Sequence, residues 1–130
     1  MAEMIFLNKT MNFNNLCWHD AVIKNINIDR AKPGINDSIL FDIIWPNGHK
    51  CKLVFEEVYM AQFSLNFGIV CTENILSAFL LEKDNKVLTD FYLKWRGLLT
   101  IELQCYVINL NSTGGEIKII SRGFKVITAK

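Results

Sequence analysis

Long hydrophobic runs and an excess of one charge are both missing from this chain of 130 residues. No apolar stretch approaches the roughly 20 residues that a membrane-spanning helix needs. The 14 basic and 13 acidic residues are mixed along the sequence and leave a net charge of +1, so there is no basic stripe of the kind that a phosphate backbone attracts. We therefore expect neither nucleic acid nor a membrane surface as a partner.

A secretory leader and a C-x-x-C pair are also missing. The first nine residues lack a basic start, a long apolar segment and a small-residue cleavage site, which predicts a cytoplasmic protein. In that compartment the four cysteines, at positions 17, 51, 71 and 105, are expected to be reduced and mostly buried. G-x-S-x-G, H-E-x-x-H and G-x-G-x-x-G motifs are absent, so no catalytic residue, cofactor or metal is assigned from motifs.

What is present is a series of short β-branched and aromatic segments separated by turn residues, within a single domain over residues 1–130. This pattern predicts a mainly β fold, an antiparallel sandwich or open barrel of about seven to nine strands with at most one short helix. Residues 1–15 are expected to form a short edge strand or a loosely docked arm. Further strands are expected over residues 21–30, 38–45, 49–56, 58–67, 98–110, 116–121 and 123–127, with turns at 31–37, 46–48, 83–86 and 111–115.

Two segments leave alternatives open. Residues 74–81 fit a strand or a short capped helix, and the strand is preferred. Residues 20–28 fit a strand better than a helix capped by Asp20. Helical spacing of apolar residues over 87–97 predicts one short helix, and Glu56-Glu57 is expected to mark a bend or bulge.

The densest group of chemically active side chains is Cys17-Trp18-His19-Asp20. Adjacent strand residues point to opposite faces, so His19 and Asp20 are expected to face apart unless the chain turns there. The preferred interpretation is structural: Trp18 fills the end of the core, Asp20 pins the turn and His19 bonds to the backbone. A binding surface that includes Trp18, His19 and Asp20 is the next alternative, ahead of an acid–base pair.

A metal site is a further alternative, because Cys17-x-His19 and His49-x-Cys51 place a thiol and an imidazole two residues apart twice. On strands each pair would share a face, and four such ligands would suit tetrahedral zinc. Cys51, however, shares its parity with Leu53 and Phe55, which favours core packing. No metal is therefore predicted.

Two other features receive the simpler interpretation. Glu56 and Glu57 would point apart on an extended chain, so we interpret them as solvated charges at a bend. Glu57 and Tyr59 could together form a binding hot spot on the surface. The glycines of residues 111–115 read as a plain hairpin loop, without the helix and lysine of a P-loop.

Three segments together resemble small bacterial β-rich domains of unknown function, some of which are predicted immunity proteins of polymorphic toxin systems. They are Trp18-His19-Asp20-Ala21 before a β-branched strand, residues 53–59 and residues 111–119, and the resemblance covers about Leu16 to Val126. It implies a binding protein and brings no catalytic residues.

The sequence thus predicts a non-enzymatic cytoplasmic protein that binds a partner, in particular an immunity-type protein that neutralises a toxin. Its candidate binding residues are Trp18, His19, Asp20, Glu57 and Tyr59. The alternative is a metal-dependent or hydrolytic enzyme that uses His19 and Asp20 with Cys17, His49 and Cys51. A homodimer through an edge strand stays open.

Overall fold

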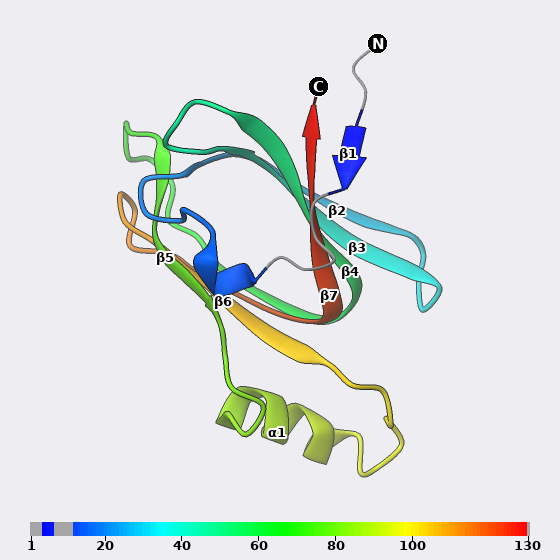
Figure 1. Ribbon diagram of the computed structural model, residues 1–130. Helices are drawn as coiled ribbons and strands as arrows, with labels where there is room; N and C mark the ends of the chain where they lie inside the picture. Colours follow the sequence, from blue (N-terminus) through cyan, green and yellow to red (C-terminus); the bar gives the residue numbers. More distant parts are fainter. Residues whose placement is uncertain (1–3, 7–11, 130) are drawn as a thin grey trace.

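Seven strands and one helix form the computed structural model, which describes residues 4–6 and 12–129 (Figure 1). All strand pairings in this part of the chain are antiparallel, so the expected mainly β, antiparallel fold with one short helix is confirmed. The elements are β1 (Met4–Phe6), the 3-10 turn η1 (Phe13–Asn15), β2 (Val22–Lys32), β3 (Asn36–Ile44), β4 (Lys50–Ser64), β5 (Glu73–Leu80), α1 (Lys86–Lys94), β6 (Gln104–Leu110) and β7 (Glu116–Ala129).

The strands pair in the order β1-β7-β4-β3-β2-β5-β6, and β6 also pairs with β7. This last pairing closes a ring of six strands, to which β1 is added at the C-terminal end of β7. The ring is weakest between β2 and β5, which share only the pairs Val22–Asn74 and Ile23–Glu73.

A bend in β4 shapes the molecule. The strand pairs with β3 only as far as Phe55, and its register against β7 shifts between Val58 and Met60. Glu57 has a left-handed φ of 50°, which confirms the bend expected at Glu56-Glu57, and the bulge itself lies just after it, between Val58 and Met60. The expectation of separate strands on each side of the bend was wrong: β4 and β7 each run through it, because they stay paired from Cys51–Thr128 to Ser64–Glu116.

The main core lies inside the ring and is dominated by aromatic rings. Phe13, delivered by η1, has its ring centroid 4.6 Å from that of Trp18 and 4.8 Å from that of Tyr106. Phe55 of β4 lies 5.0 Å from Tyr106 and 5.7 Å from Phe41. Since all five side chains are almost fully buried, short-range ring packing holds the N-terminal segment against the sheet.

A second, smaller core lies under α1, outside the ring. Leu88 of the helix packs there with Leu103, Cys105 and Ile120. The helix begins where Asn85 accepts a hydrogen bond from the Leu88 N–H at 2.9 Å, as capping residues do. The helix expected within 87–97 is therefore confirmed.

Other local expectations divide. Residues 73–80 form a strand, as preferred, and the helix alternative for 20–28 fails because β2 begins at Val22. The expected strand over 98–110 was too long, since β6 begins only at Gln104. The Tyr92 hydroxyl donates to the Ile101 carbonyl and accepts from the Leu103 N–H, which ties this segment to α1. Of residues 1–15, only 4–6 and 12–15 fall within the described part.

Candidate functional site

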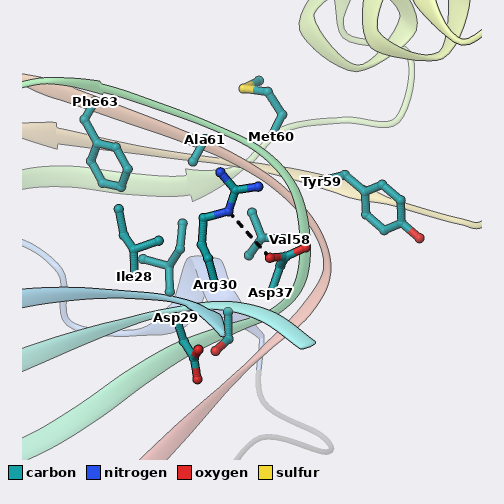
Figure 2. Close-up of a pocket in the computed structure, with 11 residues that line it drawn as sticks. Ile28, Asp29, Arg30, Asp37, Val58, Tyr59, Met60, Ala61 and Phe63 are labelled. Carbon is teal, nitrogen blue, oxygen red and sulfur yellow. Dashed lines mark ion pairs between the residues drawn. The ribbon is translucent and has the colours of Figure 1, made fainter. Parts of the chain in front are cut away.

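A groove of about 370 Å³ opens where β4 bends away from β3. We call it the hairpin groove, because one wall is the β2–β3 hairpin and the other is the outer half of β4 (Figure 2). It forms because β3–β4 pairing ends at Ile39–Phe55, so the start of β3 and the rest of β4 separate. Its lining consists of residues 28–30 of β2, 37–39 of β3, and 58–61 and 63 of β4.

The floor of the groove is apolar. Ile39 is only 2% exposed, whereas Ile28 opposite it in the β2–β3 register is 52% exposed. Val58, Ala61 and Phe63 pack against the main core from the β4 side. Half-exposed aliphatic side chains over a buried floor are typical of pockets that bind a large apolar side chain of a partner.

The rim carries three charged side chains. The Arg30 side chain points across the groove from β2, and its Nε lies 3.8 Å from Oδ1 of Asp37 (Figure 2). Asp37 Oδ2 accepts the Gly34 N–H at 2.9 Å, while its Oδ1 is buried without a hydrogen bond among the described residues. Asp29 accepts the Ala31 N–H at 2.9 Å. The guanidinium of Arg30 therefore keeps donors available for a planar acceptor.

The backbone of β4 beside the groove has a free edge. Within the described ranges, residues 56–64 pair with β7 on one side and with no strand on the other. An unpaired edge presents a row of N–H and C=O groups that another strand can use. The groove thus combines an apolar floor, a rim of mixed charge and a strand edge.

Two of the residues expected to bind lie at this bend. Tyr59 lines the groove and is 36% exposed, with its ring directed outward (Figure 2). Glu57 lies in an adjoining depression, where its carboxylate is 3.5 Å from a guanidinium nitrogen of Arg122. Glu56 pairs separately with Lys125 at 2.9 Å and lines the same depression, so the two carboxylates have different partners but do not point to opposite faces as expected.

Ile28, Arg30 and Asp37 were missed by sequence reasoning. Ile28 and Arg30 lie on the same face of the predicted strand over residues 21–30, and residues 31–37 were predicted to be a turn, so nothing in the pattern indicated a binding site. The one available signal was a cation following two isoleucines on the same face, at positions 26 and 28. It becomes meaningful only once β4 is known to bend away.

Trp18 is a core residue, as the structural interpretation predicts. It is 4% exposed and its Nε1 donates to the Phe13 carbonyl at 2.7 Å. His19 also behaves as that interpretation expects, since its Nδ1 donates to the Leu76 carbonyl at 3.1 Å. The Asp20 N–H donates to the Ile75 carbonyl at 2.9 Å.

The expected separation of His19 and Asp20 was wrong. Asp20 has a φ of 69°, so the chain turns there and brings its carboxylate within 3.7 Å of His19 Nε2. Both side chains are more than half exposed to solvent. The pair lies outside the hairpin groove.

Cys17, His19, His49 and Cys51 do not converge on a metal site. Among the described residues, no group of three or more His, Cys, Asp or Glu side chains could hold a metal ion. Cys51 points into the core, where burial raises the pKa of its thiol to about 11, whereas Cys17 is exposed. Cys105 is also buried and Cys71 is exposed, so the expectation of mostly buried thiols holds for two of the four.

A scan against protein-family models and searches of curated proteins and solved structures found no match to this chain. In the described part of the chain no helix has the length and apolar character to cross a membrane.

Proposed function

We propose that this chain is a non-catalytic binding protein that holds a segment of a protein partner in the hairpin groove. The observation that carries the proposal is the coincidence, in one place, of an apolar floor, the free donors of Arg30 and the unpaired edge of β4. Each of these meets a different part of a polypeptide: a large side chain, a carbonyl or carboxylate, and a main chain.

The binding mode follows from these three parts. An extended partner segment pairs with residues 58–64 of β4 and places alternate side chains over the groove. One large apolar side chain contacts Ile28, Val58 and Phe63, and Arg30 donates to an acceptor of the partner. Tyr59, beside the groove, adds a ring that can cover the bound segment.

We infer that the ring of six strands works as an open barrel, and that the hairpin groove is its mouth, where β3 and β4 part. Barrel mouths are common binding positions. A second copy of the chain would compete for the same β4 edge, so a homodimer and a bound partner would exclude each other there.

The resemblance to immunity-type domains suggests a cytoplasmic toxin as the partner. Immunity proteins that face nucleases gain from an acidic surface, whereas this chain has a net charge of +1. We therefore expect a toxin that does not act on nucleic acid. The groove supports this with a rim of mixed charge, since its lining includes Arg30 together with the carboxylates of Asp29 and Asp37.

Hydrolysis at His19–Asp20 is the alternative, and the 3.7 Å approach of the two side chains is the observation in its favour. His19, however, uses Nδ1 to hold the Leu76 carbonyl, and its Nε2 faces Asp20. That arrangement fixes a loop and leaves neither ring nitrogen directed at a substrate. The geometry favours binding at the groove.

If the partner is a toxin, we expect its gene to lie directly beside the gene of this chain. The test expresses the product of that neighbouring gene in cells with and without this chain. We expect growth arrest by the neighbour alone, rescue by the wild-type chain and loss of rescue with Arg30→Glu. Lys24→Glu, an exposed charge reversal on β2 outside the groove lining, should still rescue. His19→Ala should also rescue. A harmless neighbour, or rescue by Arg30→Glu, would contradict the proposal.

A further inference from the structure

The turn that follows α1 protrudes from the molecule. Arg96 and Gly97 have left-handed φ angles of 49° and 79° and reverse the chain. The Arg96 N–H donates to the Leu93 carbonyl at 3.0 Å, and the Leu98 N–H donates to the Trp95 carbonyl at 2.9 Å. Two linked turns thus hold residues 93–98, here called the basic turn, at the end of the molecule away from the C-terminus (Figure 1).

Large apolar side chains of the basic turn face solvent. Leu93 is 72% exposed, Leu98 is 81% exposed and Trp95 is 43% exposed. The buried face of α1 is supplied by other residues, with Leu88 at its centre, so these three are not required for the helix to pack. Trp95 leans on Phe91, with their ring centroids 6.3 Å apart, which holds the indole in place without covering it.

The cations of the basic turn have no acidic partner. Lys94 and Arg96 are exposed, and neither forms an ion pair with a described residue. Nearby charges are matched: Lys86 pairs with Asp90 within α1, and Lys83, before the helix, pairs with Glu102, before β6. No acidic residue occurs between Asp90 and Glu102, so the turn carries a local positive charge that the balanced whole chain conceals.

We propose that the basic turn is a docking site for the surface of an anionic lipid bilayer. Trp and Leu side chains that alternate with Lys and Arg match the interface, where indole rings and aliphatic groups enter the headgroup layer and cations meet lipid phosphates. Charge selects this occupant, because two unpaired cations beside exposed leucines complement a surface that is anionic outside and apolar beneath. The proposal revises the sequence expectation of no membrane partner and is independent of the hairpin groove.

The experiment measures co-sedimentation of the full chain with vesicles made of equal parts phosphatidylglycerol and phosphatidylcholine. We expect binding to these vesicles, weak or no binding to phosphatidylcholine alone, and a blue shift of tryptophan emission that Trp95→Phe removes. Lys94→Gln and Arg96→Gln should each weaken binding about fivefold. Raising the salt from about 0.1 M to about 1 M should weaken it further, because the Debye length falls to about 3 Å.

Variants at exposed apolar positions distinguish binding through the basic turn from nonspecific hydrophobic adsorption of the protein to vesicles. Leu98→Asp should abolish co-sedimentation, whereas Val70→Asp, at a fully exposed position in another loop, should leave it unchanged. Far-UV circular dichroism checks that both variants keep the fold. Absence of binding to anionic vesicles, or equal binding by Leu98→Asp and wild type, would overturn the proposal. So would capture of the turn by a protein partner with no affinity for vesicles.

Discussion

At the scale of single residues, two buried thiols and one buried phenol set the protein's response to alkali. Cys51 and Cys105 lie in the two cores, and burial raises the pKa of both thiols from 9.0 to about 11. Burial also raises the pKa of Tyr106, whose hydroxyl donates to Gln104 at 2.6 Å. All three side chains are held in their neutral form by the fold.

These groups predict that stability falls as the solution becomes alkaline. In the unfolded chain the thiols ionise near their ordinary pKa of 9.0, whereas the folded chain keeps them protonated to about 11. Their contribution is therefore complete below about pH 9 and is lost as the pH rises through about 11. Urea unfolding followed by circular dichroism at several pH values measures it.

Matched double variants isolate the thiols in that experiment. Cys51→Ala with Cys105→Ala should flatten the decline above pH 9, although it lowers stability at neutral pH by creating cavities. Cys17→Ala with Cys71→Ala, at exposed positions, should reproduce the wild-type decline. If the stability of the Cys51→Ala, Cys105→Ala variant falls with pH in parallel with that of the wild type, groups other than these thiols are responsible.

At the scale of elements, the hairpin between β6 and β7 is pressed against the end of β4. A Cβ added to Gly115 would lie 2.5 Å from the Ser64 carbonyl oxygen and 3.1 Å from a methyl carbon of Leu110. The neighbouring Asn66 side chain donates to the Thr113 carbonyl at 2.8 Å. Only glycine allows this close approach, which fixes where the outer half of β4 ends.

Gly115→Ala should therefore lower the free energy of unfolding by about 1–3 kcal/mol, because backbone has to move to admit the methyl group. Gly123→Ala on β7 is the control, since its added Cβ would meet nothing within 4 Å. That variant should stay within about 0.5 kcal/mol of the wild type. Equal stabilities for the two variants in chemical denaturation would refute the close approach.

The elements also show what local sequence can predict. Pro46-Asn47-Gly48 and the glycines at 114 and 115 mark hairpins, because turn residues act over a few positions. Apolar spacing around Leu88 identified α1 for the same reason. Residues 98–103 were misread as strand because their apolar content resembles one. They lie beside the helix because the Tyr92 hydroxyl donates to the Ile101 carbonyl and accepts from the Leu103 N–H, tertiary contacts that a local pattern does not reveal.

The candidate site was less predictable than the elements. Of the residues singled out at the predicted bend, Tyr59 lines the groove, whereas Glu57 lies in the adjoining depression. Arg30 and Asp37 belong to the β2–β3 hairpin. They line a groove with β4 only because β3–β4 pairing stops at Ile39–Phe55, which the sequence does not show. The 3.7 Å approach of His19 to Asp20 was missed because a left-handed aspartate is invisible to a period-two pattern.

At the scale of the whole molecule, the two proposed binding sites lie on different parts of the ring of strands. The hairpin groove lies between the β2–β3 hairpin and β4, whereas the basic turn follows α1 on the outside of the ring (Figure 1). A protein partner in the groove and a lipid surface at the turn therefore use different elements. Variants of one site should leave the other unaffected.

The central claim is that a partner segment pairs with the free edge of β4 in the hairpin groove. Hydrogen–deuterium exchange of this chain, with and without the purified product of the neighbouring gene, tests it most directly. We predict slower exchange on binding in residues 58–64 and in the β2–β3 hairpin, with no change around His19 or in α1. Protection confined to residues 17–20, or no protection along β4, would contradict the claim.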